Sequence, residues 1–329
     1  MAMTEEPWLS WPDQLPQGAD RGSRPEPPQH WYMRRELHLA IGILVAIFTV
    51  YLAGQRATAG ARAILDERLV QSGAGADAAL IGIESEQLSA VRAVAFTQGV
   101  GAALIKRDGP ALNPLVAPLQ ANSTVPMIDV VEPDGRVLLA VRSKGAPAPV
   151  ASRKGLLALT QSLRQARGAR GGRLSEIVIF RSGPTLLTIG PIVVGGTPVG
   201  AVLAMTPLAD VLGRISQELN VELTAYDVTG DPVATTASFD PKALDPSTAQ
   251  ALIGGGAIVT RYSRSNHREK LGRLIVDHQP DAVLGVSLKD DSNRTGRMVS
   301  IYTAIGLLCA SLIFASLWAR VVLARSRNS

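Results

Sequence analysis

The stretch that decides the fold runs from Thr185 to Leu219 and reads TLLTIGPIVVGGTPVGAVLAMTPLADVLGRISQEL. Two runs rich in branched apolar residues, 185–194 and 199–205, flank a Gly-Gly-Thr-Pro turn, and this pattern predicts two antiparallel strands. From Leu208 to Leu219, apolar residues recur every three or four positions, which is the spacing of an amphipathic helix. Strands followed by a helix that can cover their sheet predict an α+β unit.

The residues before this stretch extend the same unit. A helix is predicted at 112–121, and the runs 127–131 and 136–142 flank the turn Glu132-Pro133-Asp134-Gly135. Proline presets one backbone angle of such a turn and glycine tolerates the left-handed region, so a hairpin is predicted. A helix at 152–168 and a strand at 176–181 complete the expected unit.

The pattern then begins again after residue 220. Strands are predicted at 221–226 and 233–236 around the turn Asp227–Asp231, and Gly230 lies 95 residues after Gly135. A short helix near 247–253 and strands at 257–263, 271–277 and 282–288 follow, and AVLGVS at 282–287 echoes AVLAMT at 201–206. We interpret this as an approximate internal repeat with a smaller second copy.

Two apolar segments flank the repeat. Leu37–Gly54 and Met298–Ala319 contain no Asp, Glu, Lys or Arg, and a helix of about 20 such residues can cross a bilayer. Ala57-Thr58-Ala59 resembles a signal-peptide cleavage site, but the first apolar core is longer than a typical leader, so we expect a retained anchor. Arginines before the first segment and after the second predict that both termini are cytoplasmic and that the central domain is periplasmic or extracellular.

Composition excludes several classes of site. A formal net charge of +5 over 329 residues, without a concentrated basic face, argues against nucleic acid as a partner. The single cysteine, Cys309, lies in the second apolar segment, so the central part has no disulfide or thiol nucleophile. His267 and His278 are in different predicted elements, and we expect no metal, no cofactor, no catalytic residue and no enzyme activity.

The hairpins VVEPDGRVLL and AYDVTGDPVATT, with the segment 190–212 (GPIVVGGTPVGAVLAMTPLADVL), carry a resemblance to a known family. The central part resembles the double Cache sensor domain, a PAS-like extracytoplasmic fold of bacterial chemoreceptors, sensor kinases and membrane cyclases. The resemblance implies two tandem PAS-like modules on a long N-terminal helix, flanked by two transmembrane helices in the bacterial inner membrane. Its amino-acid-binding subgroup carries an Arg-x-Trp-Tyr motif that residues 140–180 lack.

The resemblance also suggests a division of the chain. We expect a receptor without an output domain, because only ten residues follow Ala319. The expected segments are a disordered cytoplasmic tail (1–36), a transmembrane helix (37–55), the long helix of the sensor (56–109), the membrane-distal module (110–216), the membrane-proximal module (217–297), a second transmembrane helix (298–319) and a short cytoplasmic tail (320–329).

The expected ligand site lies in the membrane-distal module. Asp129 interrupts an apolar strand, and Arg142 and Arg181 lie near the ends of predicted strands, so we predict that these three residues contact a ligand. Arginine binds carboxylates bidentately, which favours an anionic ligand. A further arginine run, Arg164, Arg167, Arg170 and Arg173, is either a solvated helix end or a rim over this site.

Two functions remain open from the sequence. The first is a membrane-anchored sensor that detects a small molecule and acts through a partner membrane signalling protein. The second is a non-catalytic structural or assembly subunit of a cell-envelope complex that uses a Cache-like scaffold for protein contacts. Small residues in the second apolar segment, such as Gly306 and Ala310, suit helix contacts in either case, and a homodimer is compatible with both.

Overall fold

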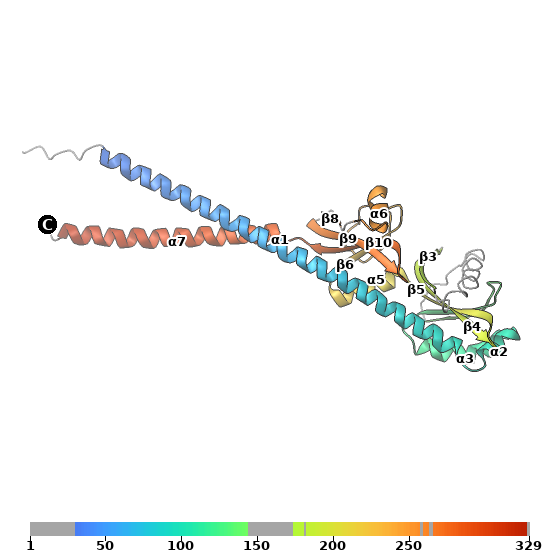
Figure 1. Ribbon diagram of the computed structural model, residues 1–329. Helices are drawn as coiled ribbons and strands as arrows, with labels where there is room; N and C mark the ends of the chain where they lie inside the picture. The colour runs from blue at the N-terminus through green and yellow to red at the C-terminus, as the bar shows by residue number, and fades with distance from the viewer. Residues whose placement is uncertain (1–29, 144–173, 181, 257–258, 263–265, 328–329) are drawn as a thin grey trace, which may run out of the picture. The chain divides into compact units, whose positions relative to one another are not determined.

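The computed structural model describes residues 30–143, 174–180, 182–256, 259–262 and 266–327. The chain divides into two units, Gly54–Met298 and the terminal segments Met1–Ala53 with Val299–Ser329. Two long helices, α1 (His30–Ala95) and α7 (Ser292–Arg327), contribute to both units (Figure 1).

Apolar side chains are exposed all round the terminal unit. Ile43, Leu44, Ile47 and Phe48 of α1 and Phe314 of α7 are each more than half exposed. A helix that is apolar on every side suits lipid better than water. By length and composition, α1 and α7 are each able to cross a membrane.

Both helices extend beyond the apolar segments that the sequence indicates. The helix α1 begins at His30, inside the segment expected to be a disordered tail, and α7 continues to Arg327. Neither proline nor glycine occurs in 30–40 or 320–327. Adding a residue to an existing helix costs little, so both helices continue past their apolar parts.

The first sheet of the central unit contains five antiparallel strands in the order β2-β1-β5-β4-β3. Its strands are β1 (Met127–Val131), β2 (Val137–Arg142), β3 (Leu174–Phe180), β4 (Gly183–Val194) and β5 (Thr197–Pro207). The short helix α2 (Val100–Ile105) and the helix α3 (Gly109–Ala121) precede β1. Asp108 caps α3 by accepting a hydrogen bond from the Ala111 amide over 3.0 Å.

The second sheet repeats this order strand for strand, as β7-β6-β10-β9-β8. Its strands are β6 (Glu222–Tyr226), β7 (Pro232–Thr235), β8 (Val259–Tyr262), β9 (His267–Val276) and β10 (Gln279–Lys289). The helix α5 (Leu208–Leu219) connects the two sheets, and α6 (Pro246–Ile253) lies between β7 and β8. The α+β fold with two tandem modules is therefore confirmed, and so is the internal repeat.

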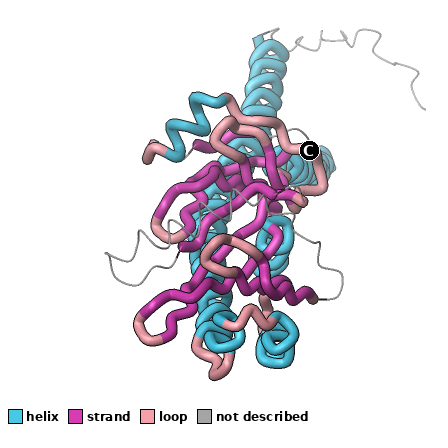
Figure 2. Tube along the Cα trace, turned by 90° about the vertical axis from the view of Figure 1, so that its right-hand side faces the viewer, coloured by secondary structure: helices cyan, strands magenta, loops and turns pink. Residues whose placement is uncertain are grey.

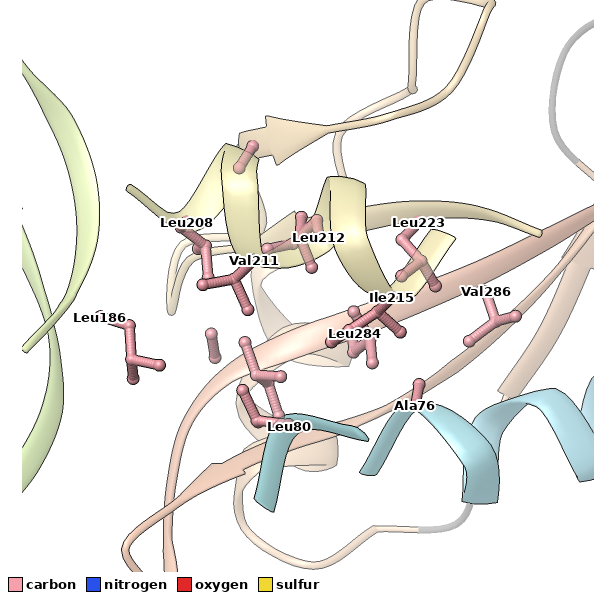
Figure 3. Packing of buried hydrophobic residues seen from close by; sticks show 14 of the residues in the cluster. Ala76, Leu80, Leu186, Leu208, Val211, Leu212, Ile215, Leu223, Leu284 and Val286 are labelled. Atoms are coloured by element: carbon pink, nitrogen blue, oxygen red, sulfur yellow. The ribbon is translucent and has the colours of Figure 1, made fainter. Parts of the chain in front are cut away.

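One helix packs on both sheets. In the second module, Leu69, Ala76, Leu80 and Ile83 of α1 share a buried core with one face of α5 and the strands β6 and β10. Figure 3 shows Ala76 and Leu80 with Val211, Ile215 and Leu284 of this core. In the first module, Val91 and Val94 of α1 join the core of β1 and β5. In Figure 2 the strands of both sheets lie against this helical segment. We call this side of each sheet the α1 face and the opposite side the far face.

The predicted secondary structure agrees closely with the structure. The strand 127–131 and the helix 208–219 have the predicted bounds, and the other strands shift by only a few residues. The long helix ends at Ala95 and resumes as α2, because Gly99 adopts a positive φ of 94° between them. The helix predicted at 152–168 lies outside the described residues.

Candidate functional site

Asp129 and Arg142 form an ion pair on the far face of the first sheet. Asp129 pairs with Ala140 across the strands, and Arg142 pairs with Met127, so the two side chains are diagonal neighbours on one face. The Nη1 atom of Arg142 also donates to the carbonyls of Val141 at 2.9 Å and Ile128 at 3.4 Å. The structure thus brings together two of the three predicted ligand residues.

The two side chains of this ion pair differ in solvent exposure. The Asp129 side chain is 8% exposed and that of Arg142 is 22% exposed. Burial raises the pKa of Asp129 above its ordinary value, although the hydrogen bond and the charge of Arg142 act in the opposite direction. Among the described residues, Nε and Nη2 of Arg142 have no hydrogen-bond acceptor. The guanidinium therefore keeps donors that an anion could use.

Apolar side chains surround the pair on the far face. Met127, Val131, Leu187, Ile189 and Leu203 form a buried cluster there. Small-molecule sites combine apolar walls with a few polar groups, and both kinds of side chain occur here. The third predicted residue, Arg181, lies outside the described residues, as do Arg164, Arg167, Arg170 and Arg173.

The far face of the second sheet carries a different polar group. The Tyr226 hydroxyl donates to Oε1 of Glu269 at 2.7 Å, and Nε of Arg261 donates to Oε2 at 2.7 Å. Nη2 of Arg261 donates to the Tyr226 oxygen at 2.9 Å and to the Lys242 carbonyl at 2.8 Å. Tyr226 and Glu269 are 0% and 1% exposed. We call these three residues, Tyr226, Arg261 and Glu269, the Tyr-Glu-Arg cluster.

The side chains of the Tyr-Glu-Arg cluster are hydrogen-bonded to one another. Burial raises the pKa of Tyr226, and the neighbouring Glu269 carboxylate raises it further, so the phenol stays protonated and donates. Gly285 of β10 leaves the space that Glu269 occupies, because a Cβ at this position would collide with Oε1. The sequence pattern attributed Tyr226 to a hairpin and missed this cluster, whose members come from three strands.

Other residues from the sequence analysis have structural roles. Asp227 accepts hydrogen bonds from the Thr229 amide and the Asp231 amide at 2.9 Å each, and so shapes the second hairpin as predicted. The His267 ring lies 4.5 Å from the Phe239 ring, and its Nε2 lies 3.4 Å from Glu222 Oε2. Within the described ranges, no group of three or more His, Cys, Asp or Glu side chains is placed to hold a metal.

The junction between the modules is acidic. The turn after β9 uses Asp277 and His278 at positive φ, and the Asp277 amide donates to Glu84 of α1 at 3.3 Å. Asp277 and Asp281 in turn accept from the Ser175 and Ile177 amides of β3, each at 3.4 Å. The second module therefore contacts both β3 and α1 through carboxylates.

Desolvation governs the titration of this junction. Loss of hydration raises the pKa of Glu84, Glu176 and Asp281, and the nearby carboxylates add to each shift. For Glu84, the Asp277 amide and the charge of His278 oppose the rise. The junction thus holds more protons when folded than the same groups hold in an unfolded chain.

Comparison with solved structures finds similar sensory domains. The chain is similar to the periplasmic domain of Vibrio cholerae LuxQ, at a TM-score of 0.45 and 15% identity over 67% of this chain and 99% of that one. It is similar to the ligand-binding domain of Campylobacter jejuni Tlp3 in complex with L-valine, at a TM-score of 0.48 and 12% identity. That match covers 72% of this chain and 97% of the Tlp3 domain. A sensory box/GGDEF family protein from Vibrio parahaemolyticus provides a third similar domain, at a TM-score of 0.46 and 11% identity. That match covers 72% of this chain and 99% of the other.

No family model matches the chain, and no curated protein matches its sequence. At 11–15% identity the solved structures provide no residue equivalences, so the candidate site rests on the geometry of this chain alone.

Proposed function

We propose that this chain is a membrane-anchored extracytoplasmic sensor that binds a small molecule and acts through a partner membrane signalling protein. In this proposal the apolar parts of α1 and α7 cross the inner membrane, both termini are cytoplasmic, and the central unit is outside. The proposed domains are those expected from the sequence, with the membrane-distal module at 110–216 and the membrane-proximal module at 217–297. No catalytic role is proposed.

One observation carries the proposal. The 66-residue helix α1 contains the first apolar segment and also contributes buried side chains to both modules. Leu80 packs in the second module and Val91 in the first, so a change in either core acts on the same helix. A ligand shifts such a helix only if it binds two arrangements with different affinities.

The second helix meets the first at the end of the central unit. Nε of Arg62 donates to Ser292 Oγ at 3.4 Å, and Nη2 donates to Asn293 Oδ1 at 3.3 Å. An ideal Cβ on Gly296 would lie 3.3 Å from Thr58 Cβ and would collide with its hydroxyl. The α7 helix begins at Ser292, directly after β10 ends at Lys289, so little chain separates the second sheet from this contact.

The Arg142–Asp129 pair supports an anionic ligand, because the remaining donors of Arg142 are compatible with a carboxylate. On the far face of the second sheet, the groups of the Tyr-Glu-Arg cluster bond to one another and to the Lys242 carbonyl.

The test uses the full chain in lipid nanodiscs. Thr58→Cys and Gly296→Cys are introduced together in a Cys309→Ser background, because their Cβ separation of 3.3 Å is close to the roughly 3.5–4.5 Å of disulfides. Small carboxylates, amines and nucleosides are screened for thermal stabilisation, and hits are tested for their effect on the rate of disulfide formation. We expect at least one stabilising compound to change this rate several-fold.

The opposite result favours the structural alternative. A chain that no compound stabilises, and that co-purifies in mild detergent with a membrane protein at fixed stoichiometry whatever is added, is an assembly subunit. Compounds that stabilise the chain without changing the disulfide rate overturn the coupling through α1 and α7.

A further inference from the structure

A groove runs between α1 and the second sheet on the side of β9. It has a volume of about 310 Å³, at the low end of the roughly 300–1,000 Å³ found for small-molecule sites. Val70, Gly73 and Asp77 of α1 line one side, and Lys270, Gly272 and Arg273 of β9 line the other. The buried side chains of Leu284 and Val286 in β10 also contribute to its lining.

Two glycines keep the groove open. An ideal Cβ at Gly73 or at Gly272 meets no other atom within 4 Å, so the space beside each backbone is empty. Gly272 pairs with Leu284 and Lys270 pairs with Val286, which places these residues on the α1 face of the sheet. The groove therefore lies beside the helix that carries the proposed signal.

The charges of the lining favour an anion. Lys270 is cationic and lies on the α1 face, whereas Arg273, which also lines the groove, pairs with Val283 and belongs to the far face. Asp77 is the one carboxyl in the lining. None of these three side chains has a hydrogen bond or ion pair with another residue in the described part of the chain. Loss of hydration raises the pKa of Asp77.

We propose that the groove between α1 and β9 binds a small organic acid with an apolar body. Lys270 would hold the carboxylate, and Val70, Leu284 and Val286 would contact the apolar body. The site differs from the Asp129–Arg142 pair, which lies in the other module on a far face. The proposal deepens the proposed function and rests on its premise that the central unit binds a small molecule.

The test measures binding of benzoate and hexanoate to the full chain in nanodiscs, by calorimetry and by ligand-observed NMR, with empty nanodiscs as the blank. Acetate lacks the apolar body, and hexylammonium reverses the charge. We expect benzoate and hexanoate to compete with each other and to bind at least tenfold more tightly than either of these two compounds.

Variants locate the site. Gly73→Leu fills the groove from the helix and should abolish binding, while Lys270→Gln should weaken it about tenfold. Gly82→Leu is the matched control, because Gly82 also lies on α1 with no atom within 4 Å of an ideal Cβ but does not line the groove. Gly82→Leu should bind as the wild type does, and thermal melts of all three variants check folding.

Three outcomes overturn the groove site. Binding that survives Gly73→Leu unchanged, equal binding of hexylammonium, or no binding of benzoate and hexanoate to the wild type each exclude it. None of these results contradicts the proposed function, which fails separately if stabilising compounds leave the disulfide rate between positions 58 and 296 unchanged.

Discussion

Gln87 of α1 donates a hydrogen bond from Nε2 to Oγ1 of Thr206 in β5 over 2.8 Å. The same amide donates to the Leu186 carbonyl at 3.3 Å and accepts from the Thr188 hydroxyl at 2.6 Å. Gln87 is 1% exposed. The helix is therefore fixed to the first sheet by a buried polar contact, which permits fewer alternative positions than apolar packing alone.

Replacing this amide should destabilise the central unit. In Gln87→Leu the hydroxyls of Thr188 and Thr206 lose a buried partner, and we expect a loss of about 1–3 kcal/mol. For a unit of this size, each kcal/mol lowers Tm by about 2–4 °C. Thermal melts of the full chain measure the effect. Gln71→Leu is the control, because Gln71 lies on an exposed part of α1, and equal melting of both variants would contradict the role of Gln87.

The Tyr-Glu-Arg cluster should contribute to stability as a unit. Tyr226→Phe removes the donor to Glu269 and an acceptor for Arg261, at a cost of about 1–2 kcal/mol. Glu269→Gln should cost a comparable amount. Denaturant unfolding of both single variants and the double variant forms a cycle, and we expect the double loss to differ from the sum of the two. Additive losses would show that Tyr226 and Glu269 act independently.

The Asp129–Arg142 pair predicts a pH-dependent defect. Arg142→Gln leaves the Asp129 carboxylate buried without its cation, so Tm at pH 7.5 should fall. The pKa of Asp129 is already raised and rises further in this variant, so the folded state takes up a proton more readily than the unfolded state. The loss should therefore shrink as the pH is lowered from 7.5 to 5. Arg142→Gln combined with Asp129→Asn should show no such recovery.

At the acidic junction, removing a charge should raise stability, whereas removing the Arg142 charge lowers it. Because the folded-state pKa of Glu84 is raised, its ionised form lowers stability at neutral pH, and this cost disappears as pH falls through that pKa. Glu84→Gln keeps an acceptor for the Asp277 amide and removes the charge. We expect its Tm to exceed that of the wild type at pH 7.5 and the two to converge near the unfolded-state value of about 4. A lower Tm at pH 7.5 would contradict a net cost of the Glu84 charge in the folded state.

The contact between Thr58 and Gly296 predicts a rescue. Gly296→Ala places a methyl group against the Thr58 hydroxyl, and overpacking of this kind costs about 1–3 kcal/mol. Thr58→Ala removes the hydroxyl and should restore most of the loss in the double variant. Thermal melts measure stability, and the Arg62 contacts serve as the local readout by NMR. Failure of Thr58→Ala to rescue would mean that Gly296 is needed for another reason.

Local signals predicted most of the elements. The turns at Gly135 and Gly230 and the helix 208–219 depend on residues close together in sequence, and all were confirmed. The 95-residue offset also holds in the hydrogen bonds, because Gly135 bonds to Glu132 as Gly230 bonds to Asp227.

The sequence pattern did not predict the register in which the strands pair. The similarity of AVLGVS to AVLAMT equates Ala282 with Ala201. In the structure Ala201 pairs with Val131 and Val283 pairs with Tyr226, so Ala201 corresponds to Val283. A shift of one residue moves every side chain to the other face of a sheet. Only strand pairing, which joins distant residues, determines that choice.

The candidate site was partly within reach. Asp129 was singled out because a carboxylate in an apolar strand is a local anomaly. The structure pairs it with Arg142, and its contact with a ligand stays a prediction. The Tyr-Glu-Arg cluster was not found, because Tyr226, Arg261 and Glu269 lie on three strands and none is unusual in its own sequence context. The groove at Gly73 and Gly272 likewise depends on a helix and a strand that are about 200 residues apart.

The two sheets share one strand order, but the side chains on their far faces differ. The far face of the second sheet holds the hydrogen-bonded Tyr-Glu-Arg cluster, while Arg142 in the first sheet has donors that meet no acceptor among the described residues. Placing a tyrosine, an arginine and a glutamate at the matching positions of the first sheet would therefore reproduce the polar cluster of the second sheet on its far face.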